Sequence, residues 1–111
     1  ITANILQEIN MSDERIALVT GANQGIGFQV AKELVAHGWT VLVGARDSEK
    51  GQAAVGKIGK GAVFVPLDVT DARSITKAAD RIRTEHGRLD LLVNNAAISR
   101  LPHAKDLNQN S

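Results

Sequence analysis

Four short runs of the chain have the apolar, β-branched composition of strands that are buried on both faces of a sheet. They are Arg15–Thr20, Thr40–Ala45, Ala62–Val69 and Leu89–Ala97. Three longer segments separate them, with apolar residues at helical spacing or a capping residue at the start. They are Ile26–Gly38, Asp47–Gly59 and Asp71–Gly87. The order β-α-β-α-β-α-β predicts an α/β fold, with right-handed crossovers, a parallel sheet and helices on both of its faces.

Single residues mark several ends of these elements. Gly38 is expected to end the first helix in a left-handed conformation, and Asp47 to cap the second helix. Glycines inside the second helix weaken it. Pro66 indicates that the third strand lies at an edge of the sheet or ends there, because proline has no N–H to donate.

The length of 111 residues favours one domain. We expect residues 1–10 to be an N-terminal extension, with a short amphipathic helix as the alternative. Residues 11–99 then form the folded half-domain, and residues 100–111 a polar C-terminal tail.

Composition narrows the range of functions. The net charge of +1 gives no reason to expect a nucleic-acid or membrane partner, and no apolar run approaches the length of a membrane span. The chain has no cysteine, which rules out a disulfide framework or a thiolate metal site. The histidines are not at metal-ligand spacing, so no metal is expected. This composition is compatible with a reducing compartment, and we expect a cytoplasmic location.

The stretch TGANQGIG, from Thr20 to Gly27, joins the first strand to the first helix. In a parallel sheet this turn lies at the crevice where ligands bind, and the free N–H groups of the helix start attract anions. Gly21 would allow a tight turn, Gly25 the close approach of a pyrophosphate, and Gly27 close packing of helix on strand. The turn therefore predicts a dinucleotide site, against the alternative of a tight turn without a ligand.

The spacing TGxxxGxG, together with four further stretches, resembles the short-chain dehydrogenase/reductase family. These are GAR ending at Arg46, LDV with Asp68-Val69, GRLDLLVNNAA over Gly87–Ala97, and ARDSEKGQAAV over Ala45–Val55. The last is similar to the carbonyl-reductase branch in particular. Ala97 stands where the family's NNAG block has glycine. The resemblance covers about residues 14–99.

The resemblance implies a partial Rossmann-type doubly wound sheet of four strands and three helices, in strand order 3-2-1-4 and truncated. It implies that the glycine turn holds the phosphates, that Asp68 and the Val69 amide lie at the adenine, and that the NNAA block lines the nicotinamide ribose. Asn94 is interpreted as structural, and Asn95 as either structural or ligand-binding. The cofactor residues expected are Gly21, Asn23, Gln24, Gly25, Ile26, Gly27, Arg46, Asp68, Val69, Asn95, Ala96 and Ala97.

Arg46 decides the expected cofactor. An acidic residue after the second strand binds a ribose 2′-hydroxyl, whereas an arginine pairs with a 2′-phosphate. Because Asp47 is assigned to the helix cap, Arg46 favours NADP(H) over NAD(H). Gln24 stands where many NADP-preferring relatives carry a basic residue, so the preference is expected to be modest.

The family's proton donor is a tyrosine, helped by a lysine and a serine, and these 111 residues contain no tyrosine. We expect the NADP(H)-binding N-terminal portion of a carbonyl/alcohol oxidoreductase, inactive by itself. The alternative is a non-catalytic nucleotide-binding or interaction module with the same fold. Because the fourth strand would leave an open edge, self-association through Leu91–Asn95 is also expected.

Overall fold

The computed structural model describes residues 14–95. The expected extension at residues 1–10 and the tail at residues 100–111 lie outside the described residues, as do Ala96 and Ala97. The described part contains four strands and three helices in strict alternation. They are β1 (Ile16–Thr20), α2 (Gly25–Ala36), β2 (Thr40–Ala45), α3 (Ser48–Ile58), β3 (Ala62–Pro66), α4 (Ala72–Glu85) and β4 (Leu91–Val93).

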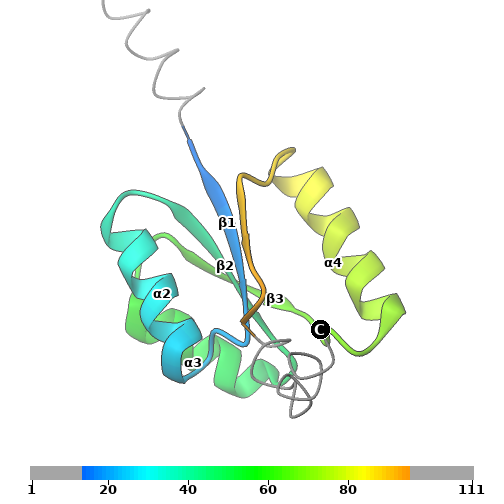
Figure 1. Ribbon diagram of the computed structural model, residues 1–111, viewed down its shortest axis with the longest axis horizontal. Coiled ribbons are helices and arrows are strands. Elements are labelled where there is room, and N and C mark those ends of the chain that lie inside the picture. The colour runs from blue at the N-terminus through cyan, green and yellow to red at the C-terminus, as the bar shows by residue number, and fades with distance from the viewer. Residues whose placement is uncertain (1–13, 96–111) are drawn as a thin grey trace, which may run out of the picture.

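The four strands form one parallel sheet in the order β3-β2-β1-β4. The predicted α/β fold and the predicted strand order 3-2-1-4 are therefore confirmed. Helices α2 and α3 lie together on one side of the sheet and α4 lies alone on the other (Figure 1). This distribution follows from right-handed crossovers, because the chain moves from β1 outward to β3 and then returns past β1 to β4.

Each face of the sheet has its own core. Along β1, Ile16 and Leu18 pack toward Ala78 and Ile82 of α4, whereas the intervening residues pack toward α2 and α3. All five residues of β1 are buried. Burial on both faces explains why the strands read as continuous apolar runs rather than alternating ones.

Two strands are shorter than the sequence predicts. β3 ends at Pro66, which is both the last residue of the strand and part of an edge strand, as its missing N–H indicates. β4 covers only Leu91–Val93. The two residues after it, Asn94 and Asn95, make side-chain hydrogen bonds to Thr20 and Gly21.

The predicted helix ends are confirmed. Gly38 has φ of +90°, and His37 immediately before it caps α2 with its Nδ1 2.8 Å from the Glu33 carbonyl oxygen. The Asp47 carboxylate accepts a hydrogen bond from the Lys50 N–H at 3.0 Å. Asp71 caps α4 in the same way, accepting from the Arg73 N–H.

At the amino ends of the strands, Asp90 fixes β4 against β1. Its carboxylate accepts the Ile16 N–H at 2.8 Å, and the Arg88 guanidinium donates to both of its oxygens. The Arg88 hydrogen bonds, followed by that of Ile16, lower the pKa of Asp90 from its ordinary value. Nearby, Trp39 packs on the core, and the Arg15 guanidinium lies 5.7 Å from its ring centroid.

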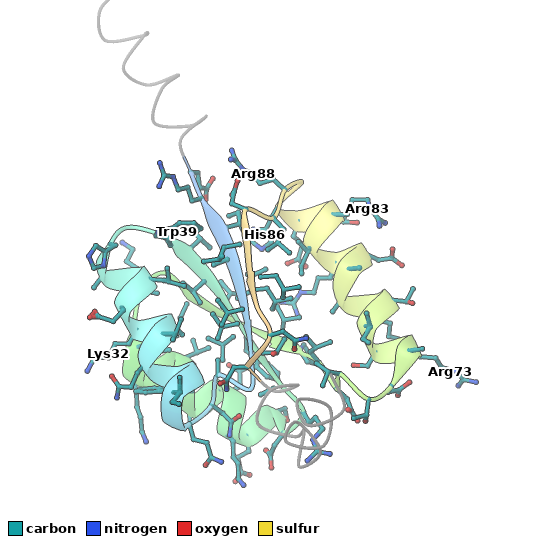
Figure 2. The ribbon with its side chains drawn as sticks, viewed as in Figure 1. Lys32, Trp39, Arg73, Arg83, His86 and Arg88 are labelled. Atoms are coloured by element: carbon teal, nitrogen blue, oxygen red, sulfur yellow. The ribbon has the colours of Figure 1, made fainter. Side chains whose placement is uncertain are left out.

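Basic side chains on the helices project away from the sheet. Figure 2 shows Lys32 on α2 and Arg73 and Arg83 on α4 pointing outward, as expected of solvated helix faces. Arg83 pairs with Asp80 at 2.8 Å.

Candidate cofactor-binding cleft

The glycine turn follows β1 directly. Gly21 has φ of +63° and Gly25 has φ of +64°, a region that side chains other than hydrogen disfavour. The two residues reverse the chain at the end of β1 and start α2 at Gly25. The turn therefore requires glycine at both positions for conformational reasons.

Gly25 and Gly27 have different surroundings. A Cβ built on Gly25 meets nothing within 4 Å, so the space above it is open. A Cβ on Gly27 would lie 2.5 Å from the Gly21 carbonyl oxygen and 2.7 Å from Asn95 Nδ2. The contacts nearest to Gly27 are therefore with Gly21, directly after β1, and with Asn95, so any side chain here would separate the helix from the turn.

The start of α2 differs from the starts of the other two helices. Its N-cap, Gln24, makes no side-chain cap hydrogen bond, and its first turn holds no acidic residue. In contrast, α3 and α4 begin with capping aspartates. The first N–H groups of an α-helix have no partner within the helix, so those of α2 are available to an anion.

The uncapped helix start opens into a cleft of about 420 Å³ at the carboxyl ends of the strands. The cleft is bordered by the loops that follow β1, β2, β3 and β4, as expected for a ligand site in a parallel sheet. Nine of the expected cofactor residues line it: Gly21, Asn23, Gln24, Gly25, Ile26, Arg46, Asp68, Val69 and Asn95. Gly27 is buried beneath them, and Ala96 and Ala97 lie outside the described residues.

Two cations that lie four residues apart in the chain border the cleft. Arg46 is exposed directly after β2, and Lys50 lies in the first turn of α3. The sequence interpretation missed Lys50. The signal that could have found it is the cap at Asp47, because a helix that starts there turns its first residues toward the same edge of the sheet.

Asp68 is held by its own loop. Its carboxylate accepts from the Thr70 N–H at 2.9 Å and from the Thr70 hydroxyl at 2.6 Å. Its N–H donates to the Ser74 hydroxyl at 2.8 Å, which ties the loop to the start of α4. These bonds orient the side chain at the rim of the cleft.

The two asparagines after β4 make different structural bonds. The Thr20 hydroxyl donates to Asn94 Oδ1 at 3.1 Å, which confirms the structural interpretation of Asn94. Asn95 Nδ2 donates to the Gly21 carbonyl oxygen at 3.3 Å and so links the end of β4 to the glycine turn. Asn95 has a structural contact, and its contact with a cofactor stays a prediction.

Residues 15–111 match the family model described as short chain dehydrogenase. The chain belongs to the short-chain dehydrogenase family. Its resemblance to that family, first suggested by the glycine turn and the NNAA block, is therefore confirmed.

Individual relatives agree with the family assignment. The chain is 47% identical to "Carbonyl reductase [NADPH] 1" of Sus scrofa over 92 residues, covering 79% of this chain and 32% of that protein. It is 43% identical over 91 residues to "(+)-neomenthol dehydrogenase" of Arabidopsis thaliana, covering 76% and 31%. The structure of salutaridine reductase from Papaver somniferum superposes with a TM-score of 0.70 at 36% identity, covering 86% of this chain and 40% of that one.

This short-chain dehydrogenase chain thus spans about a third of the length of the curated relatives that it matches. None of the helices among residues 14–95 combines the length and apolar character that a membrane span requires.

Proposed function

We propose that the described part of the chain binds NADP(H), as the cofactor-binding portion of an oxidoreductase acting on carbonyl or alcohol substrates. The observation that carries this proposal is the cleft, which is lined both by the uncapped start of α2 and by the two cations Arg46 and Lys50. NADP(H) carries negative charge on its pyrophosphate and on its 2′-phosphate. The cleft offers the start of α2 to the first and the two cations to the second.

The pyrophosphate fits the start of α2. Open space above Gly25 leaves room for phosphate oxygens beside the main chain, and a side chain at this position would occupy that room. With neither a capping side chain nor an acidic residue in the first turn, the amides of Ile26 and Gly27 are available and nothing repels the anion.

The 2′-phosphate of NADP(H) would pair with Arg46 and Lys50, which border the same cleft. The competing carboxylate, Asp47, already accepts the Lys50 N–H as the cap of α3. Asp47 is therefore a poor partner for the ribose 2′-hydroxyl of NAD(H). Lys50 also supplies the second cation that Gln24 does not, which supports a stronger preference for NADP(H) than Arg46 would give alone.

The remaining contacts rest on the resemblance. Asp68 and the Val69 amide would lie at the adenine, and Asn95, Ala96 and Ala97 at the nicotinamide ribose. Of these five, Asp68, Val69 and Asn95 line the same cleft as the glycine turn.

When bound, the cofactor supplies the hydride for carbonyl reduction. The residues of the cleft bind and orient it. The 111-residue sequence contains no tyrosine that could donate the proton. We therefore expect the chain alone to bind NADPH without turnover, which is also what a non-catalytic nucleotide-binding module would do. A cytoplasmic location stays a prediction.

The test is an isothermal calorimetric titration of the full chain with NADPH and, separately, with NADH. We expect saturable binding of one dinucleotide, with NADPH bound more tightly. Arg46→Asp should lower the affinity for NADPH relative to NADH by about tenfold or more, and so reverse the preference. The reason is that a charge-assisted bond to the 2′-phosphate is replaced by repulsion. Unchanged relative affinity in this variant would show that the 2′-phosphate assignment is wrong, and no binding of either dinucleotide would overturn the function.

A further inference from the structure

A groove lies at the β3 edge of the sheet, which is the edge opposite β4. It has a volume of about 500 Å³ and runs between the end of β3 and α4. Its apolar wall consists of Val65 and Pro66 from β3 and Ala78 from α4. Helices α2 and α3 lie on the other side of the sheet, so neither of them covers the groove (Figure 1).

Three cations of α4 line this groove. They are Arg73, Lys77 and Arg81, which follow one another at intervals of four residues. Residues four apart are neighbours on one face of a helix, so the three side chains form a single row. We call it the cation row. Its members start about 6 Å apart along the helix axis, because each residue of a helix rises by about 1.5 Å.

Helix stability does not explain the cation row. Like charges four residues apart on a helix repel each other. Arg73 also lies in the first turn of α4, where the positive end of the helix dipole disfavours a cation, and Figure 2 shows its side chain projecting outward. Arg81 pairs with Glu85 at 3.2 Å. Among residues 14–95, neither Arg73 nor Lys77 has a carboxylate within ion-pair distance.

One carboxylate, that of Asp71, lines the groove with the three cations. It accepts the Arg73 N–H at 3.0 Å as the cap of α4 and forms no ion pair with the cation row. The groove therefore has an excess of positive charge, and its potential favours an anionic partner.

The β3 edge itself is poorly suited to pair with a further strand. Pro66 has no N–H, and the Ala62 N–H already donates to the Gly59 carbonyl oxygen at 3.2 Å. An edge strand with few main-chain donors is protected against strand addition. A partner of this groove is thus recognised by the side chains of α4 rather than by the main chain of β3.

The chemistry of the groove favours carboxylates of a polypeptide over a nucleic acid. None of the described residues that line it is aromatic, so bases have no stacking platform. The net charge of +1 is also small for binding a phosphate backbone. Alternate residues of an extended chain lie about 6.6 Å apart on one face, which is close to the spacing of the cation row. Acidic segments with few apolar residues are extended in this way because they do not fold by themselves.

We infer that the groove and the cation row bind an extended acidic segment of another polypeptide, with carboxylates at alternate positions. Arg73, Lys77 and Arg81 pair with successive carboxylates of the segment. This inference concerns α4 and the β3 edge and does not depend on NADP(H) binding. The self-association expected through Leu91–Asn95 concerns the opposite edge of the sheet and stays a prediction.

The probe is a nine-residue peptide of serine with three glutamates at alternate positions, blocked at both ends. It is titrated into the full chain labelled with nitrogen-15, without cofactor and at low salt, and amide NMR shifts are followed. We expect shifts concentrated at residues 73–81 and a dissociation constant on the order of 0.1–1 mM. Salt at about 0.15 M should weaken binding several-fold, because the pairs are exposed.

Two variants test the cation row. Lys77→Glu and Arg73→Glu should each weaken the peptide about tenfold, because an ion pair is replaced by repulsion. Lys32→Glu is the matched control: it makes the same charge change at an exposed position of α2, on the other side of the sheet, and should have little effect. All three positions are exposed, and the amide spectrum of each variant checks that it is folded.

Two further ligands test the spacing and the chemistry. A peptide of the same composition with three consecutive glutamates places two of them on one face and should bind about threefold more weakly. A thymidine tetranucleotide carries the same three negative charges and should bind no better than this second peptide.

Five outcomes overturn the inference. They are no binding at about 10 mM peptide, shifts at the start of α2 and Arg46 in place of α4, and equal weakening by Lys32→Glu and Lys77→Glu. Equal affinity for the two peptides excludes the alternate spacing. Tighter binding of the tetranucleotide to α4 assigns the cation row to a nucleic acid instead.

Discussion

The side-chain amide of Asn95 donates to the main-chain carbonyl of Gly21 at 3.3 Å, so the end of β4 holds the turn that follows β1. Gly27 packs into the same corner, where a Cβ would lie 2.5 Å from the Gly21 oxygen and 2.7 Å from Asn95 Nδ2. Three residues from separate parts of the chain thus fix the geometry of the glycine turn.

This corner makes Gly27→Ala strongly destabilising. The added methyl group collides with a main-chain oxygen that cannot move without shifting the turn, so we expect a loss of about 1–3 kcal/mol in the free energy of unfolding. Urea denaturation followed by circular dichroism measures it. An unfolding midpoint equal to that of the wild type would contradict the packing described here.

Gly25→Ala is the matched comparison in the same turn. Its Cβ meets no atom within 4 Å, and the cost is conformational, about 1–2 kcal/mol for the left-handed backbone. The new methyl group points into the space proposed for the pyrophosphate. We therefore expect this variant to stay folded and to lose NADPH binding.

The sequence predicted the architecture because the fold depends on features that are local in the chain. Continuous apolar strands, the caps at Asp47 and Gly38 and the prolyl end of β3 at Pro66 all act within a few residues. They determine the alternation of elements, and the crossover rule then determines the faces.

The sequence pattern does not predict contacts between residues that are far apart in the chain. The run Leu89–Ala97 was predicted to carry the fourth strand, and the strand within it is Leu91–Val93. An apolar run does not reveal that the asparagines after this strand bond to Thr20 and Gly21. Gly51 was interpreted as a residue that weakens α3. In the structure it is a contact site, because a Cβ there would collide with the ring of Phe64 on β3.

The second prediction compares two glycines of α3. Gly51→Ala should destabilise the fold by about 1–3 kcal/mol, because the Phe64 ring must move in a packed core. Gly56→Ala on the same helix meets nothing within 4 Å and should stabilise the fold by about 0.5–1 kcal/mol through helix propensity. Thermal unfolding of both variants gives the signs, and two effects of equal sign would refute the assignment of Gly51.

The third prediction concerns acid and Asp90. Its pKa is lowered in the folded state, mainly by Arg88, so the ionised carboxylate stabilises the fold above its unfolded pKa of 3.8. That contribution is lost as the pH falls below this value toward the folded pKa. The stability advantage of the wild type over Asp90→Asn should thus be full at pH 6 and shrink below about pH 4.

Asp80→Asn serves as the control for Asp90, because Asp80 pairs with Arg83 on the exposed surface of α4 and holds no strand in place. Urea denaturation across the pH range should show the acid-dependent difference for Asp90→Asn and little difference for Asp80→Asn. A difference for Asp90→Asn that stays constant down to pH 2 would exclude the ionised carboxylate as its source.

The last prediction tests Lys50, the cation that the sequence interpretation missed. Lys50→Glu places a negative charge beside the proposed 2′-phosphate and should weaken NADPH about tenfold, with a smaller effect on NADH. Lys57→Glu makes the same charge change two turns further along α3, away from the cleft, and controls for net charge. Calorimetric titrations at low and at high salt separate the two, because long-range repulsion is screened by salt whereas a direct contact is screened much less. If both variants weaken NADPH equally and high salt removes the effect, Lys50 contributes only to the general field of the protein and not to a phosphate site.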